Sequence, residues 1–504
     1  MTADDAAPCP PDAPRPPDAD DVGVLGTGDP DDLGVGRPDR ARVPRRRVLA
    51  WALWDWGSAA FNAVITTFVF TRWITSSDFV AADVVAAADA EEALGIDGPA
   101  QSLLDGILAD HSAWLAWGLS IAGVLIAVSA PVVGARSDDG GRRRRWLAVN
   151  TFITVAFSAA MFFVAPDPDN LTQNLLLGIA LLAAGNIFFE LASVNYNATL
   201  SQVSNAGNVG RVSGIGWGMG YLGGIVLLLI LFVGFINPEV GWFGVGDDGG
   251  LRFRVAVLFS ALWFAVFAIP VLVAVPEVPA SPSRARLSVA AAYRKLFADV
   301  AVLWHERRDV LRFLIASAVY RDGLAGVFTF GAVIASVTFG FTPSGVIVFA
   351  IAANVVAGLA TIIGGFVEDK VGPKSVIVTS LVGLLVSGVA VFLLHDAGQT
   401  AFWVFGLLLC LFVGPAQSSS RTMLARRIPP GREAEIFGMY ATTGRAASFM
   451  APLAFAVFVS VAGAQYWGVL GIMLVLGVGL ALLLPIPGAP AGQDVRAGTG
   501  VGEV

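Results

Sequence analysis

The chain has 504 residues, of which 56% are hydrophobic and 14% are charged, and its formal net charge is −7. Soluble domains carry about 25% charged residues, so this composition excludes an ordinary soluble protein and indicates one that lies in a lipid bilayer. Two cysteines and three scattered histidines exclude a disulfide framework and a metal site. We expect no cofactor and no nucleic-acid partner.

Apolar runs of membrane-spanning length recur along the chain between two polar tails. Residues 1–47 are rich in Pro, Asp and Gly and hold too few apolar residues to pack a core, so we expect a disordered tail there and a second one over 486–504. A bilayer core about 30 Å thick requires about 20 apolar residues per helix. Twelve runs meet this length: 48–74, 112–136, 146–165, 174–196, 211–235, 253–276, 311–339, 345–367, 375–394, 400–423, 436–461 and 465–485.

A basic segment in the middle of the chain, residues 277–310, divides these runs into two sets of six. We therefore predict one six-helix bundle over 48–276 and another over 311–485. Parts of the segment between them, residues 293–297 and 302–304, fit either a surface helix at the lipid headgroups or an ordinary solvated linker. Both alternatives remain open.

Basic residues fall on one side of the predicted membrane. Lys and Arg stay in cytoplasmic loops, and a cytoplasmic N-terminus puts the basic turns and the central linker on that side, whereas loop 77–111 contains eight acids and no Lys or Arg. We expect both termini in the cytoplasm. The predicted fold class is an all-α integral membrane protein with twelve transmembrane helices in two pseudo-symmetric bundles.

Two short charged turns occupy equivalent places in the two halves, after the second and the eighth apolar runs. Each turn has an acid at a helix end, a glycine for the bend and then basic residues, which predicts a charge clasp that holds neighbouring helices and releases them as the halves move. The alternative is that the basic residues only fix the topology. The candidate gating residues are Asp138, Gly141, Arg142, Arg143, Asp369, Gly372 and Lys374.

A membrane half that occurs twice is typical of secondary transporters, and the two turns resemble the hallmark of the major facilitator superfamily (MFS). Longer segments resemble its vacuole-effluxer, autophagy-related branch: 51–61, 196–200, 212–224, 320–323, 417–421 and 430–440. The resemblance implies the MFS fold, with helices 1, 4, 7 and 10 lining the central path. It also suggests amino-acid export, because fungal members are similar to vacuolar amino-acid exporters. The chain departs from the pattern at residues 57–59 and at Arg445.

Charged residues that we place inside the bilayer are independent evidence for function, because each costs roughly 2.5–3.5 kcal/mol at a helix centre. Three acids and three bases balance, which predicts pairing or a wet cavity. These residues are Asp55, Glu190, Arg321, Asp322, Arg421 and Arg445. Asp322 lies about 16 Å along helix 7, near mid-membrane.

Two roles remain open for these charges. Asp322 is either a site of proton coupling or one half of a permanent Arg–Asp pair. Arg321 and Arg445 either hold a substrate carboxylate or only neutralise Asp55 and Glu190. Asn62 and Gln417 add hydrogen-bonding groups, which more often join helices than bind ligands.

Glycines and prolines mark places where helices approach or bend. Six glycines between 214 and 224 predict close helix packing, and a dinucleotide-binding loop is rejected because no strand precedes them. Pro131, Pro415 and Pro452 predict kinks, either as bending points or for packing.

We conclude from the sequence that the chain is a solute transporter working by alternating access. A membrane receptor or scaffold on the same fold is the alternative, and no grouping of residues suggests an enzyme. Acids and arginines in the path favour a small zwitterion such as an amino acid, with protons as a possible coupling ion. The Arg- and Ala-rich composition favours a bacterial plasma membrane, and we expect a monomer.

Overall fold

The computed structural model describes residues 43–95, 98–238, 240–277, 294, 305, 308–428 and 431–488, and every regular element among them is a helix. The predicted tails lie largely outside these residues, and so does most of the central linker. Whether that linker forms a surface helix therefore stays a prediction. The predictions of a disordered N-terminus and a disordered C-terminus likewise concern mainly residues that are not described.

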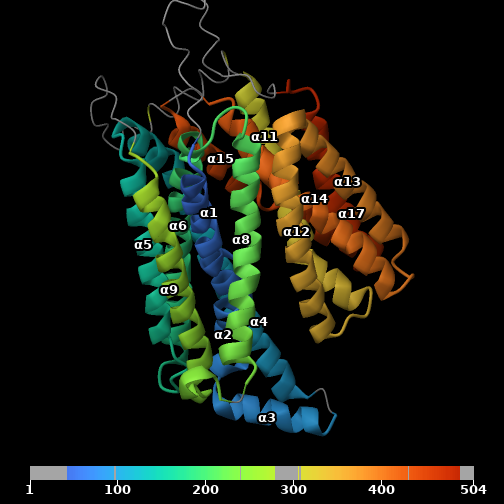
Figure 1. The fold of residues 1–504 in the computed structure, drawn as a ribbon. Coiled ribbons are helices and arrows are strands. Elements are labelled where there is room, and N and C mark those ends of the chain that lie inside the picture. The colour runs from blue at the N-terminus through green and yellow to red at the C-terminus, as the bar shows by residue number, and fades with distance from the viewer. Residues whose placement is uncertain are drawn as a thin grey trace, which may run out of the picture. The chain divides into compact units, whose positions relative to one another are not determined.

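The first half begins with a helix in three pieces, because a nine-residue π-helical segment interrupts it (Figure 1). A shorter helix, α3, precedes the second long helix. The elements are α1 (Arg45–Ala59), η2 (Ala60–Phe68), α2 (Phe70–Ile74), η3 (Ser77–Phe79), α3 (Ala82–Ala93), α4 (Pro99–Asp139), α5 (Arg143–Ala160), η4 (Met161–Phe163), α6 (Leu171–Ala198), α7 (Leu200–Val203), α8 (Val209–Leu231), η5 (Phe232–Ile236), η6 (Trp242–Gly244), η7 (Asp248–Gly250) and α9 (Leu251–Ala274).

The second half repeats the pattern of long helices, and here the helix that breaks is its fifth. The elements are α11 (Arg308–Val337), α12 (Pro343–Val371), α13 (Pro373–Leu393), α14 (Gln399–Ala425), α15 (Glu433–Ala447), α16 (Met450–Ala462) and α17 (Trp467–Leu483). Each predicted apolar run coincides with one of these helices or with two or three successive helical pieces.

Ten stretches of helix in the described part of the chain are long and apolar enough to cross a membrane. The final apolar helix, Trp467–Leu483, is shorter, and the first run is divided among α1, η2 and α2. An all-helical membrane protein is thus confirmed, whereas twelve crossings and cytoplasmic termini stay predictions.

Pro452 accounts for the break between α15 and α16. Proline has no N–H, and its ring clashes with the carbonyl four residues earlier, which here belongs to Ser448, in the turn between the two helices. The predicted bend at Pro452 is therefore present as a break. Pro131 and Pro415 lie inside α4 and α14, which continue through them.

The two halves meet along α8 and α12 and along α4 and α15. Glycine makes both contacts possible. A Cβ atom on Gly214 would lie 2.6 Å from the Thr361 carbonyl oxygen, and one on Gly134 would lie 2.2 Å from that of Ala434. The prediction of close helix packing is confirmed for Gly214, Gly218 and Gly223, whereas an added Cβ atom at Gly220 would have no neighbour closer than 3.6 Å.

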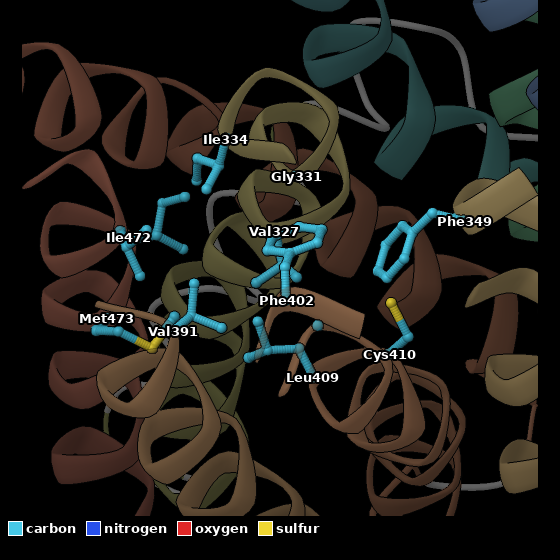
Figure 2. A pocket seen from close by; sticks show the side chains of 12 residues that line it. Val327, Gly331, Ile334, Phe349, Val391, Phe402, Leu409, Cys410, Ile472 and Met473 are labelled. Atoms are coloured by element: carbon cyan, nitrogen blue, oxygen red, sulfur yellow. The ribbon is translucent and has the colours of Figure 1, made fainter. Parts of the chain in front are cut away.

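A small apolar cavity of about 40 Å³ lies within the second half (Figure 2). Side chains from α11, α12, α13, α14 and α17 line it, among them Val327, Phe402 and Ile472, together with the buried thiol of Cys410. None of the predicted charged residues reaches it. The candidate site must be sought between the halves instead.

Candidate functional site

The first charged turn closes on a helix of the opposite half. The Asp138 carboxylate accepts hydrogen bonds from Arg143 Nε at 2.6 Å and from the backbone N–H groups of Ala434 (3.2 Å) and Glu435 (2.9 Å) at the start of α15. Arg143 continues across the contact to the Glu433 carboxylate. Asp138 and Arg143 are buried, and both belong to the predicted clasp.

The second turn also contacts a helix of the opposite half, through other residues. Asp369, at the end of α12, accepts hydrogen bonds from the backbone N–H groups of Gly210 (2.9 Å) and Arg211 (3.2 Å) at the start of α8. Lys374 takes no part in this contact, because its ammonium donates to the Leu484 carbonyl at 2.8 Å. The predicted acid–base clasp therefore forms at the first turn only.

Both aspartates share one physical role, since each lies at the N-terminus of a helix from the other half. Unpaired N–H groups and the helix dipole favour a carboxylate at that place. Gly141 and Gly372 supply the bends with φ values of 58° and 84°, a region that glycine occupies at little cost. Arg142 is exposed. We name the end of the molecule that carries these two turns the turn end.

Arg421 is the centre of a buried cluster between the halves. It projects from α14 into the first half, where its guanidinium donates to the Ser213 hydroxyl (2.9 Å) and carbonyl (2.7 Å) and to Asn197 Oδ1 (3.1 Å). Its Nη1 lies 3.6 Å from Asp55 Oδ2. The Tyr196 hydroxyl donates to the same Asp55 oxygen at 2.8 Å, so Asp55 has both a charged and a neutral donor.

Aromatic rings complete this cluster. The Arg421 guanidinium carbon lies 5.0 Å from the ring centroid of Trp51, 5.8 Å from that of Trp217 and 6.0 Å from that of Tyr196. A cation near such rings gains electrostatic stabilisation that grows when water is excluded. The arrangement therefore places the charge of Arg421, a residue of the second half, among side chains of the first half.

A second ion pair joins the halves on α6 and α15. Arg445 Nη2 lies 2.6 Å from Glu190 Oε1 and 3.4 Å from Asn186 Oδ1. The side chains of Arg445 and Glu190 are 30% and 25% exposed, whereas the Arg421 side chain is only 4% exposed.

Arg321 and Asp322 do not pair with each other, although they are neighbours on α11. The Arg321 guanidinium lies 3.8 Å from the ring centroid of Tyr440, and its Nη1 donates to the Tyr440 carbonyl at 3.3 Å. Asp322 accepts the backbone N–H of Ala451 at 2.5 Å and that of Met450, at the start of α16. Among the described residues no arginine forms an ion pair with Asp322. Its neighbour Arg321 does not reach it, because successive residues of a helix point in different directions.

The two predicted amide side chains differ in their surroundings. Gln417 Oε1 accepts a hydrogen bond from the Tyr221 hydroxyl at 3.0 Å, and this bond joins α14 to α8. Asn62 is exposed on the π-helical segment η2. Such segments occur frequently at functional sites.

Several partners were not predicted as site residues. Tyr196, Asn197, Ser213 and Tyr440 lie within the segments that carry the family resemblance, so the signal was present but their roles were not visible. Glu368 was missed altogether. It is fully buried beside Asp369 and accepts hydrogen bonds from the hydroxyls of Ser419 (2.7 Å) and Thr422 (2.5 Å).

The described residues contain no group of three or more His, Cys, Asp or Glu side chains that could hold a metal ion. The polar groups between the halves are instead cations, carboxylates, amides and aromatic rings. This set of groups suits the binding and release of a small polar solute.

Comparison with known proteins points to the same kind of molecule. The chain is 23% identical over 438 residues to an uncharacterized MFS-type transporter, YxiO, of Bacillus subtilis (strain 168), covering 87% of this chain and 94% of that one. It is 24% identical to autophagy-related protein 22 of Cryptococcus neoformans var. neoformans serotype D (strain B-3501A) over 336 residues. That match covers 62% of this chain and spans 58% of the fungal protein.

Solved structures share the fold. The proton:xylose symporter XylE matches with a TM-score of 0.66 at 13% identity over 89% of this chain and 96% of that one. The human organic anion transporter MFSD10 matches with a TM-score of 0.64 at 16% identity over 87% and 99% of the two chains. The family model described as vacuole effluxer Atg22 like matches residues 43–494. The chain is therefore a membrane transporter rather than an enzyme, and it belongs to the Atg22-like vacuole effluxer family of MFS-type transporters.

Proposed function

We propose that this transporter moves a small zwitterionic solute, an amino acid, by alternating access across a bacterial plasma membrane. The observation that carries the proposal is the set of charges of both signs on α6, α11 and α15. Arg321, Arg445 and Glu190 all lie on these helices, and the side chain of each is partly exposed.

Arg321 is the proposed site for the substrate carboxylate. Among the described residues it has no carboxylate within ion-pair distance, and its partners are the ring and carbonyl of Tyr440. Arginine binds carboxylates through two parallel hydrogen bonds. Glu190 is the proposed partner for the substrate ammonium group. The ammonium group would take the place of the Arg445 guanidinium beside the Glu190 carboxylate.

Alternating access requires the contacts at the turn end to open. The structure holds the halves together there through Asp138, Asp369 and the Asp55–Arg421 pair. We infer that this state is closed towards the cytoplasm and that the reverse state breaks these cross-half bonds. Removing a single partner of a buried ion pair is costly, so the two charges must separate into water or be neutralised.

Asp55 is the proposed site of proton coupling. It faces a cation from the opposite half, so protonation would remove one side of a cross-half ion pair and favour opening. Asp322, the alternative, faces backbone N–H groups of its own half. The working direction that we propose is export from the cell.

The proposal is tested by uptake of a labelled amino-acid panel into proteoliposomes, with and without an imposed pH gradient. Arg321→Ala should abolish uptake of every transported amino acid, and Asp55→Asn should abolish only the response to the gradient. Arg72→Ala is the matched control, because Arg72 is exposed on α2, and it should transport like the parent.

Three results would contradict the proposal. Transport that survives Arg321→Ala would remove the carboxylate site, and a gradient response that survives Asp55→Asn would remove Asp55 from coupling. Absence of both flux and binding for the whole panel would discard the amino-acid class and favour the receptor or scaffold alternative.

A further inference from the structure

The break between α15 and α16 separates two parts of one helix with different neighbours. α15 packs against α4 and α6 of the first half as well as against α11 of its own half, whereas α16 packs against α11 and α17 of its own half. The part before the break carries contacts that close the turn end, including a hydrogen bond from the Thr442 hydroxyl to the Ala127 carbonyl at 2.8 Å. When the two halves move relative to each other, the contacts of α15 with the first half must therefore change, whereas the contacts of α16 with α11 and α17 need not.

Two neighbouring residues of α11 hold the two sides of this break. Arg321 contacts α15 through the ring and carbonyl of Tyr440, and a Cβ atom on Gly444 would meet its guanidinium at 3.3 Å. Asp322 contacts α16 through the N–H groups of Met450 and Ala451.

The contact of Asp322 replaces bonds that the break removes. A helix N-terminus leaves its first N–H groups without partners inside the helix, and Pro452 prevents α15 from continuing into α16 to supply them. Asp322, on α11, accepts hydrogen bonds from two of these N–H groups, and it is only 8% exposed. A buried N–H group without a partner is costly, so this carboxylate has a structural reason to stay where it is.

We propose that the break is a hinge, with Asp322 as the positioning residue that anchors α16 to α11 while α15 moves with the gate. Arg321 is the releasable contact, because a substrate carboxylate would compete with Tyr440 for its guanidinium. Substrate binding would then free α15 from α11 and leave α16 in place. This inference rests on the proposed function, since it gives the substrate-binding arginine a second task.

Replacements of Asp322 separate anchoring from proton coupling. Asparagine keeps an oxygen that accepts N–H groups and is as good a helix cap as aspartate, whereas glutamate keeps the charge but places its oxygens one methylene further out. Anchoring predicts that Asp322→Asn works better than Asp322→Glu. Proton coupling or pairing with a cation predicts the reverse order. Asp322→Ala removes both functions, and Ser317→Ala is the control, because the buried Ser317 hydroxyl bonds only within α11.

Two readouts are combined in the full chain with Cys9 and Cys410 replaced by alanine. The first is disulfide formation between Ala127→Cys and Thr442→Cys, named here the 127–442 cross-link. The second is the initial rate and half-saturation of amino-acid uptake. Asp322→Asn and Ser317→Ala should behave as the parent, and Asp322→Ala should lower the cross-linking rate about fivefold, the ratio expected for a lost helix cap. The maximal uptake rate should fall with it while half-saturation stays unchanged.

Asp322→Asn as damaging as Asp322→Ala, or Asp322→Glu better than Asp322→Asn, would overturn the anchor. So would an unchanged cross-link in Asp322→Ala. If that variant does not reach the membrane, the order of the Asn and Glu variants still decides. The cross-link requires no substrate, so failure of the amino-acid proposal and failure of the hinge are distinguishable.

Discussion

The two contacts between the halves occupy equivalent positions but differ in chemistry. Where α4 meets α15, Asp138, Arg143 and Glu433 form a chain of charges across the contact. Where α8 meets α12, Asp369 bonds only to backbone N–H groups, and Gly214 and Gly365 bring the two backbones together. Both contacts bring helix backbones close together through glycine, but only the α4–α15 contact adds a chain of ion pairs among the described residues.

This difference separates two requirements of the closed state. A buried charged side chain requires its partner at one defined position, because moving the partner away leaves a buried charge unpaired, which costs several kcal/mol. Packed helices gain many small contacts whose sum falls when the surfaces separate. We infer that α4 and α15 define the closed position of the halves, and that α8 and α12 supply close contact along their length.

The largest effect is expected for Asp138→Ala. It leaves the buried Arg143 with Glu433 alone and removes the cap from α15, so the closed state should lose about 3 kcal/mol, the lower end of the range for breaking a buried pair. The 127–442 cross-link should fall strongly. Asp110→Ala on the exposed part of α4 is the control, and an unchanged cross-link in Asp138→Ala would show that charges do not define the closed position.

Gly214→Ala tests the packed contact. Its Cβ atom would lie 2.6 Å from the Thr361 carbonyl oxygen, and overpacking of this kind costs about 1–3 kcal/mol. Gly220→Ala on the same helix is the matched control, because its nearest atom would be 3.6 Å away. Equal cross-linking of the two variants would contradict the role given to close approach.

A smaller effect is expected for Asp369→Ala, because only a helix cap is lost, at a cost of about 1 kcal/mol. The comparison with Asp138→Ala is the sharpest test of the difference between the two contacts. Lys370→Ala, at the exposed neighbouring residue, should cross-link like the parent. A loss in Asp369→Ala as large as in Asp138→Ala would mean that both turns hold the halves equally.

The smallest effect is expected for Lys374→Ala. Its ammonium bonds to the Leu484 carbonyl at an exposed position within one half, and such surface changes stay within about 0.5 kcal/mol. The cross-linking rate and the midpoint of thermal unfolding should both match the parent. A clear gain or loss of cross-linking would restore Lys374 to the clasp that the sequence pattern predicts.

Most of the fold could be predicted from the sequence. Apolar length located every long helix, Pro452 located the break in the α15–α16 helix, and glycine spacing located the packed face of α8. The π-helical segment η2 was not predicted, because a bulge within a continuous apolar run leaves no mark in composition. The division of the first run into α1, η2 and α2 follows from it.

The sequence alone predicted six charges inside the bilayer and a balance of three acids and three bases. Only the tertiary structure decided the pairs: Asp55 with Arg421 and Glu190 with Arg445 join the halves, whereas Arg321 and Asp322 take a ring and a helix end as partners. The physical reason is geometric. Successive residues on a helix turn away from each other, so neighbours in sequence contact different helices, and partners 366 and 255 positions apart in the chain meet when the helices pack.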